Sequence, residues 1–320
     1  MSKKVRIGIT IGDPSGIGPE VVVKSLRRFH VPFDSEILIF GDSIALKKCG
    51  FKRNLNARLI DLQQVKTSKL RFGVLSRESG RASLSYLVEA VKFLKLGAIN
   101  CLVTAPVNKQ AISLSGKKFY GHTEFLADSF GVKDFAMLFF SNDLKISLVT
   151  RHTALRDVAR ALDKKRIFKT ILLTHRFCRD FLGRKSPSIA ISGLNPHASE
   201  GGLIGDEEKK IIAPAINLFR KKVHMSRGVV GPLPPDTIFH KALNKEFDAV
   251  VSMYHDQALI PFKMLHFLDG VNVTLGLPFV RTSCDHGTAF EIAGKNRADH
   301  RSLLAAIKLA YKLTKSKLSR

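Results

Sequence analysis

The chain has 320 residues, 45% of them hydrophobic and 25% charged, a balance typical of a globular protein with one or two domains. No apolar run reaches the roughly 18 residues that a membrane-spanning helix requires, and the N-terminus lacks the pattern of a signal peptide. The four cysteines form no CxxC pair, so we expect a reduced, cytoplasmic protein.

The charge raises the question of nucleic-acid binding, because 52 Lys and Arg face only 27 Asp and Glu, a net charge of +25. These cations are spread along the whole chain in ones and twos, and no basic arm, zinc-finger spacing or RNA-recognition signature is present. A positive field that attracts small anionic substrates is a compatible interpretation. We therefore expect neither a nucleic acid nor a membrane as partner, and keep a basic nucleic-acid-binding protein as the alternative from another class.

From the N-terminus onward, the hydrophobic pattern predicts strands and helices in alternation. A strand over 5–12 leads into the glycine-rich turn "DPSGIGPE" and a helix near 21–26. The turn could bind an anion at the helix N-terminus, but it is neither a P-loop nor a GxGxxG motif, and a structural turn is equally consistent. A strand over 36–42 follows, and then a helix whose apolar face contains Leu84, Leu87, Val88, Val91 and Leu94 and which ends near Gly97.

The rest of the chain continues the alternation, which favours a mostly parallel sheet covered by helices on both faces. The further expected strands are 101–106, 145–150, 188–193, 249–254 and 270–276, and the further expected helices are 154–162, 167–181, 207–219 and 302–315.

Polar clusters follow four of these strands, in "TAPVNK", "TRHTAL", "GLNPHASEGG" and "YHDQ". Ligand sites of open α/β sheets lie beyond the carboxyl ends of strands, so we expect the functional site there. His152, His197 and His255 each follow a strand and could together hold a divalent metal, although a single histidine in such a place is usually only hydrogen-bonded. The acidic residues 206–208 are expected to cap the helix that follows.

Lys263, Asn272 and Arg281 suit a phosphorylated substrate, because arginine binds phosphate through two parallel hydrogen bonds. Taken singly, each is more typical of an ordinary surface residue. Whether they bind a substrate therefore has to be judged from the sequence segments around them.

Nine segments, in order over nearly the whole chain, resemble the 4-hydroxythreonine-4-phosphate dehydrogenase family of pyridoxal 5'-phosphate biosynthesis. They are "ITIGDPSGIGPE", "SRESGRASL", "LVTAPVNK", "GHTEFLA", "LVTRHTAL", "LNPHASEGGLIGDEE", "GPLPPDTIF", "MYHDQALIPFK" and "GVNVTLGLPFVRTSCDHGTAFEIAGKNRAD".

The resemblance implies an isocitrate/isopropylmalate dehydrogenase-like fold, in which two α/β domains flank a cleft. Residues 1–128 plus 282–320 would form the first domain, on the cofactor side, and residues 129–281 the second, on the metal and dimer side, with approximate boundaries. It also implies a homodimer with the active site at the subunit interface.

The resemblance further assigns roles to individual positions. The metal ligands fall on His152, His197 and His255, for one ion of zinc, magnesium or cobalt. NAD or NADP would bind without a GxGxxG motif, at the loop that runs from His286 to Gly294. The residues that would contact the substrate are His122, Thr123, Lys263, Asn272 and Arg281, and those that would contact the cofactor are His286, Gly287, Thr288 and Ala289.

The implied reaction is the metal-dependent, NAD(P)-linked oxidation of 4-phosphooxy-L-threonine to 2-amino-3-oxo-4-phosphooxybutanoate, which decarboxylates to 3-amino-2-oxopropyl phosphate. The alternative substrate is a 4-phosphorylated sugar acid, threonate or erythronate 4-phosphate. Asp236 and Lys263 are the candidates for proton transfer, and Asp256 could orient His255. Lys295 and Asn296 stand where the family pattern suggests a more glycine-like turn.

Overall fold

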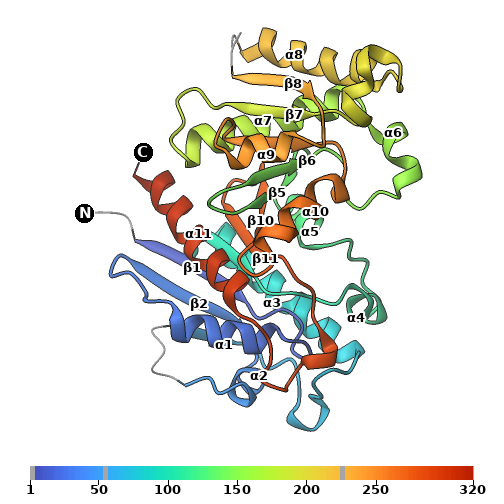
Figure 1. Ribbon diagram of the computed structural model, residues 1–320. Coiled ribbons are helices and arrows are strands. Elements are labelled where there is room, and N and C mark those ends of the chain that lie inside the picture. Colours follow the sequence, from blue (N-terminus) through green and yellow to red (C-terminus); the bar gives the residue numbers. More distant parts are fainter. Residues whose placement is uncertain (1–3, 53–56, 224–227, 320) are drawn as a thin grey trace. The chain divides into compact units, whose positions relative to one another are not determined.

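The structure is a computed structural model that describes residues 4–52, 57–223 and 228–319 (Figure 1). The chain divides into two compact units: Met1–Val132 together with Leu277–Arg320 form unit 1, and Lys133–Gly276 forms unit 2. None of the helices in the described ranges is long and apolar enough to cross a membrane. Both units are of the α/β type.

Unit 1 contains a parallel sheet whose strands, apart from the edge strand β3, are buried along most of their length. Because all its neighbouring strands run in the same direction, their carboxyl ends meet at one edge, where the loops of a ligand site gather. In spatial order the strands are β3 (Arg58–Asp61), β2 (Ser35–Gly41), β1 (Val5–Thr10), β4 (Cys101–Thr104) and β11 (Val280–Cys284).

Two groups of helices cover this sheet. Helix α11 (Arg301–Leu318) packs on β1, β4 and β11 and against α1 (Gly18–Arg28), while α3 (Arg77–Lys95) packs on β1 and β2 and against α4 (Lys109–Leu114). The apolar face predicted for α3 is buried at Leu87, Val91 and Leu94, but Val88 is 39% exposed. The shorter helices are α2 (Ser43–Lys48) and α5 (His122–Ser129).

Unit 2 has a mixed sheet. Its first two neighbouring pairs, β10 with β5 and β5 with β6, are antiparallel, and the remaining pairs are parallel. In spatial order the strands are β10 (Val271–Leu275), β5 (Ala136–Phe140), β6 (Lys145–Leu148), β9 (Ala249–Ser252), β7 (Ile189–Ser192) and β8 (Val229–Leu233).

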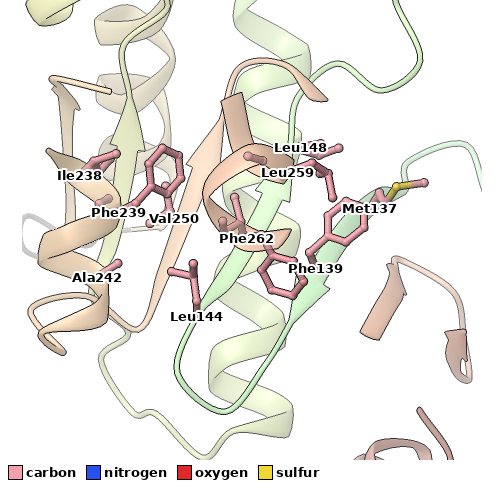
Figure 2. Close-up of a cluster of buried hydrophobic side chains, with 13 residues drawn as sticks. Met137, Phe139, Leu144, Leu148, Ile238, Phe239, Ala242, Val250, Leu259 and Phe262 are labelled. Carbon is pink, nitrogen blue, oxygen red and sulfur yellow. The ribbon is translucent and has the colours of Figure 1, made fainter. Parts of the chain in front are cut away.

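Successive residues of β9 supply two different cores, because neighbouring side chains of a strand point to opposite faces of the sheet. Val250 lies in a cluster with α9 (Ile238–Leu243) and α10 (His255–His266), which Figure 2 shows. Val251 lies in a second cluster with α7 (Lys164–Phe181) and α8 (Ala213–Val223). The sheet is therefore covered on both faces, as the strand–helix alternation predicts.

Two predicted helices differ from the structure. In place of a helix over 154–162 there is a 3₁₀ turn, Leu155–Asp157, and a single turn, α6 (Val158–Ala161). It stops there because Leu162 is extended and Asp163 caps α7, accepting the Arg166 N–H at 2.8 Å. The helix expected over 207–219 begins as a π-helical segment, Glu208–Ile212, and continues as α8.

Candidate active site

Two of the three predicted metal ligands lie side by side in unit 2. His152 follows β6 and His255 is the first residue of α10, directly after β9; β6 and β9 are parallel neighbours. Their ring centroids are 5.6 Å apart, and the rings are tilted by 43°. Both line a pocket of about 150 Å³ together with Tyr254 and Asp256. We call His152 and His255 the imidazole pair.

Asp256 holds one ring of the imidazole pair in place. The His255 Nδ1 atom lies 2.6 Å from Asp256 Oδ1, a distance at which Nδ1–H donates to the carboxylate. This leaves Nε2 as the nitrogen that can bind a metal, and a carboxylate partner also makes the imidazole a stronger ligand. The contact is the one that the sequence suggested for Asp256.

His197 lies on a loop with an unusual backbone. From His197 to Gly201 every φ angle is positive, from 44° to 74°, and only the last of these five residues is glycine. Residues with a Cβ atom adopt this conformation at a cost, so their surroundings must hold them there. The His197 side chain is exposed.

The loop is held by a buried carboxylate. Glu208, only 3% exposed, accepts hydrogen bonds from the backbone N–H groups of Leu194 at 2.7 Å and Asn195 at 2.8 Å. Burial would raise the pKa of Glu208, but the hydrogen bonds from Asn195 and Leu194 outweigh it and lower the pKa. The prediction that residues 206–208 cap the following helix is wrong, because no side chain caps it.

The described residues contain no group of three His, Cys, Asp or Glu side chains placed to hold a metal ion. The structure thus brings His152 and His255 together in one chain and leaves His197 on its own exposed loop.

Unit 1 contains a buried basic cluster formed by Arg281, His122 and Thr123. Arg281 is on β11, only 3% exposed, and donates from Nη2 to Thr104 Oγ1 at 2.6 Å, at the end of β4. Burial lowers the pKa of the Arg281 guanidinium to about 10. Thr123, in the first turn of α5, is 4% exposed.

His122 is neutral in this cluster. Burial, followed by the charges of Arg281 and Lys109, holds its pKa well below 6.5. Its Nε2 atom is buried and has no hydrogen-bond partner among the described residues. A buried polar atom of this kind suits a ligand oxygen, and the neighbouring guanidinium makes an anionic oxygen the best match.

The other predicted substrate and proton-transfer residues belong to unit 2. Lys263 is on α10, with Nζ 5.6 Å from the centre of the Phe267 ring. Asn272 is on β10, and within the described ranges its buried Oδ1 has no hydrogen-bond partner. Asp236 is exposed in the turn before α9. The structure gives Asp236 no feature that distinguishes it from a surface residue.

The predicted cofactor loop, His286–Gly294, follows β11 in unit 1. Thr288 O accepts the Ile17 N–H at 3.0 Å, and a Cβ atom at Gly16 would lie 3.1 Å from Thr288, so the turn after β1 packs closely against the loop. This favours the structural interpretation of that glycine-rich turn. His286 Nε2 is buried without a hydrogen-bond partner in the described chain, which suits a polar atom of a bound nucleotide.

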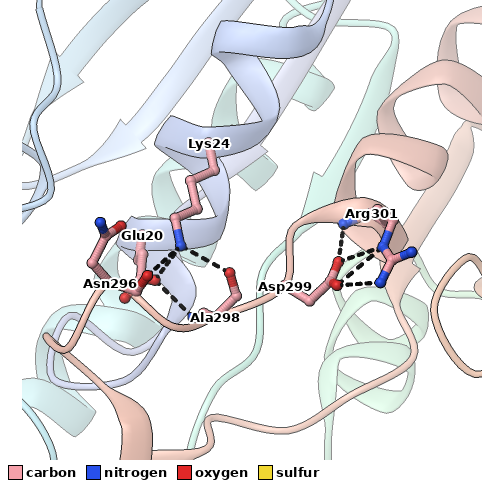
Figure 3. A network of polar contacts seen from close by, with 6 residues as sticks. All are labelled: Glu20, Lys24, Asn296, Ala298, Asp299 and Arg301. Carbon is pink, nitrogen blue, oxygen red and sulfur yellow. Dashed lines mark hydrogen bonds and ion pairs between the residues drawn. The ribbon is translucent and has the colours of Figure 1, made fainter.

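A polar network fastens the segment that follows the loop (Figure 3). Glu20 on α1, 4% exposed, accepts the Ala298 N–H at 2.8 Å and Lys24 Nζ at 2.7 Å. Lys24 also donates to the carbonyl oxygens of Asn296, at 2.9 Å, and Ala298, at 3.0 Å. Asn296 has φ = 57°, and asparagine tolerates this conformation better than most residues, which explains how it replaces a glycine-like turn.

Residues 32–310 match the family described as Pyridoxal phosphate biosynthetic protein PdxA. The chain belongs to this family. It is 44% identical to a 4-hydroxythreonine-4-phosphate dehydrogenase of Desulfosudis oleivorans, over 97% of this chain and 96% of that protein. It is 38% identical to a D-threonate 4-phosphate dehydrogenase of Salmonella typhimurium, over 96% and 98% of the two chains.

Solved structures of the PdxA family share the fold. A crystal structure of 4-hydroxythreonine-4-phosphate dehydrogenase from Klebsiella pneumoniae superposes with a TM-score of 0.86 at 37% identity, covering 98% of this chain and 99% of that one. The predicted α/β fold is confirmed. The sequence did not single out Glu20, Lys24 or Thr104. It did not reveal that Glu208 positions the loop of His197.

Proposed function

We propose that the chain catalyses the metal-dependent, NAD(P)-linked oxidation of 4-phosphooxy-L-threonine at its 3-hydroxyl group. The observation that carries the proposal is the imidazole pair, His152 and His255, at the carboxyl ends of two parallel strands. The relatives named 4-hydroxythreonine-4-phosphate dehydrogenase support the substrate. The product, 2-amino-3-oxo-4-phosphooxybutanoate, is a β-keto acid that loses CO₂ to give 3-amino-2-oxopropyl phosphate.

The imidazole pair fits a divalent metal ion, because Asp256 fixes one ring and both rings line a single pocket. Such an ion supplies Lewis acidity that lowers the pKa of the substrate hydroxyl. Imidazole ligands suit zinc or cobalt better than magnesium, which prefers oxygen ligands. We assign the third ligand to His197 of a second copy of the chain, so that the site is completed across a subunit interface.

The buried basic cluster is our assignment for the substrate phosphate. Arg281 supplies a fixed positive charge that Thr104 orients, and neutral His122 can donate from Nε2–H or accept at Nε2, according to its tautomer. Thr123 adds a hydroxyl group. The phosphate does not itself react, so its binding energy can be used to position the neighbouring 3-hydroxyl group.

Lys263 and Asn272 are assigned to the other end of the substrate, its amine and carboxylate. Lys263 stands on the same helix as His255 and is our first choice to move the hydroxyl proton, with Asp236 as the alternative. Replacing the true proton carrier lowers kcat and changes the pH profile, whereas replacing a residue that only binds raises KM. Lys263→Met and Asp236→Asn therefore distinguish the two.

The cofactor loop is our assignment for NAD or NADP, which, when bound there, would supply the hydride acceptor for the oxidation at C3. Close packing of Gly16 on Thr288 and the hydrogen bond from Ile17 restrain the loop at Thr288. His286 Nε2 offers a buried polar atom to the nucleotide. Residues Gly287 and Ala289 allow close approach because they are small.

Helix α10 supports a homodimer. Helix α10, which begins at His255, and the two residues after it expose a run of apolar side chains: Ile260 at 62%, Met264 at 82%, Leu265 at 52%, Phe267 at 70% and Leu268 at 41%. Such a patch beside a site with an incomplete ligand set suits a second copy of the chain. Met264→Glu should give monomers by light scattering, while Leu96→Glu, at a residue 81% exposed in unit 1, should leave dimers.

Relatives named D-threonate 4-phosphate dehydrogenase, 38–40% identical, support a second candidate substrate. It carries a hydroxyl group in place of the amine. The test follows NADH formation with 4-phosphooxy-L-threonine and D-threonate 4-phosphate in parallel, with erythronate 4-phosphate as a third compound. Chelation should abolish turnover, and zinc or cobalt should restore it. Turnover of the sugar acids alone would reject the threonine substrate, and no turnover of any would reject the proposed function.

A further inference from the structure

A second basic pocket lies in unit 1, outside the residues assigned so far. Its volume is about 430 Å³, which is in the usual range for a small-molecule site. Its charged lining consists of four cations against one carboxylate: Lys66, Lys69, Arg77, Arg81 and Glu78. The pocket therefore carries a charge of about +3, four positive minus one negative.

Most of this charge is not neutralised by the protein. Glu78 pairs with Lys69 at 3.5 Å, and both side chains are exposed, so this ion pair is weak. In the described part of the chain, no carboxylate forms an ion pair with Lys66, Arg77 or Arg81. Lys66, Arg77 and Arg81 are exposed, so these three cations remain available to an anion that enters the pocket.

One wall of the pocket is held rigidly. The loop after β3 is fastened by Asp42, which is 1% exposed and accepts the N–H groups of Gln64 at 2.9 Å and Val65 at 2.6 Å. Gln63, which also lines the pocket, has φ = 52°, a conformation that is strained in a residue with a Cβ atom. A strained residue in a fixed loop is typical of a binding site.

The first part of α3 also lines the pocket. Arg77 and Arg81 are four residues apart and so lie on the same side of the helix. Ser76 caps the helix start by accepting the Ser79 N–H at 3.1 Å, which fixes the point from which Arg77 projects. Two guanidinium groups with fork geometry are suited to phosphate oxygens more than to single carboxylates.

We propose that this pocket binds a phosphate-bearing small molecule, at a site distinct from the buried basic cluster. The phosphate could come from two sources: the dinucleotide cofactor or a separate phosphorylated metabolite. The first is structurally accessible because the segment next to the pocket also contacts the cofactor loop. Gly73 packs closely on Phe290 of that loop, because a Cβ atom at Gly73 would lie 2.7 Å from Phe290 O, and its N–H donates to Ser15 O, in the turn after β1, at 2.8 Å.

The test is a calorimetric titration of inorganic pyrophosphate into the full-length protein in the presence of a chelator. It compares wild type with Arg77→Gln/Arg81→Gln and with a control pair on the same helix, Lys92→Gln/Lys95→Gln, which removes the same charge outside the pocket. Thermal unfolding checks that each variant is folded. We expect one binding component to weaken by about tenfold or more in the arginine variant and to persist in the control.

An isotherm unchanged by the arginine substitutions, or equally changed in both variants, would overturn the proposal. Repeating the titration with protein that has first been saturated with NAD or NADP identifies which molecule carries the phosphate that the pocket binds. Loss of the pocket component would identify the cofactor as the ligand, and its persistence would identify a separate phosphorylated metabolite. The titration requires neither metal nor turnover, so its failure is distinct from failure of the proposed dehydrogenase activity.

Discussion

The contact between Glu20 and Ala298, in the segment after the cofactor loop, leads to a quantitative prediction. Glu20→Gln keeps an oxygen that can accept the Ala298 N–H but removes the negative charge opposite Lys24. Removing one partner of a fully buried ion pair typically costs about 3–5 kcal/mol. The Lys24 side chain is 23% exposed and keeps two carbonyl acceptors, so we expect the free energy of unfolding to fall by about 1–3 kcal/mol.

The same segment offers a matched control. Asp299 pairs with Arg301 at 2.7 Å, close to the Glu20 network in sequence, but both side chains are about half exposed. An exposed ion pair is worth roughly 0–1 kcal/mol, so Asp299→Asn should cost less than Glu20→Gln. Both substitutions remove one carboxylate from the same region. The difference between their effects on the free energy of unfolding therefore measures the contribution of burial.

Urea unfolding of the two variants measures the stability change, and steady-state kinetics measures its consequence for the cofactor. We expect Glu20→Gln to raise the KM for NAD or NADP and to leave the KM for the phosphorylated substrate nearly unchanged. Equal unfolding free energies for Glu20→Gln and Asp299→Asn would refute the reasoning about the buried pair. Equal effects on both KM values would refute a specific role in positioning the loop.

Three further predictions follow from other sites. Burial raises the Asp13 pKa from 3.8 to about 6, so the folded protein binds the proton more tightly than the unfolded chain. Stability should therefore fall by about 2 kcal/mol as pH rises from 4 to 8, relative to Asp13→Asn; parallel pH profiles of unfolding would contradict this. The variants His197→Ala and His255→Ala should each be inactive. When the two are mixed and exchange subunits, the mixture should regain about a quarter of the wild-type activity if His197 acts across the interface, and none if each chain builds its own site. Arg281→Lys should raise the KM for the substrate by roughly tenfold or more, because lysine lacks the bidentate fork, and an unchanged KM would remove Arg281 from the phosphate site.

The regular elements with strong periodicity could be predicted from sequence. Helix α7 was expected over 167–181 and begins three residues earlier, at Lys164; α11 extends beyond its predicted ends on both sides. Strand β11 was not predicted, because "VRTSC" contains an arginine and shows no apolar alternation. Its burial comes from tertiary packing between β4 and α11, which no local pattern encodes.

The candidate site could be predicted as a set of residues but not as a geometry. Histidines after strands indicate the sheet edge, yet the order of strands decides which of them meet. His152 and His255 meet because β6 and β9 are neighbours. His197 follows β7, which also pairs with β9. It lies, however, at the start of a loop in which five successive residues have left-handed backbone conformations. Neither the strand order nor that turn has a signature in a single sequence.

Glu208 shows why acidic residues in a loop cannot be assigned from position alone. In sequence it looks like a helix-capping carboxylate, because it stands among three acidic residues at the start of a helix. In the fold it turns back to the N–H groups of Leu194 and Asn195, and so satisfies two backbone donors that the left-handed loop would otherwise leave without partners. A carboxylate buried to this degree is stable only with such donors, and the same donors fix the loop that carries His197. The hydrogen bonds from Leu194 and Asn195 to Glu208 therefore do two things at once: they stabilise the buried carboxylate and they position the loop of the candidate ligand His197.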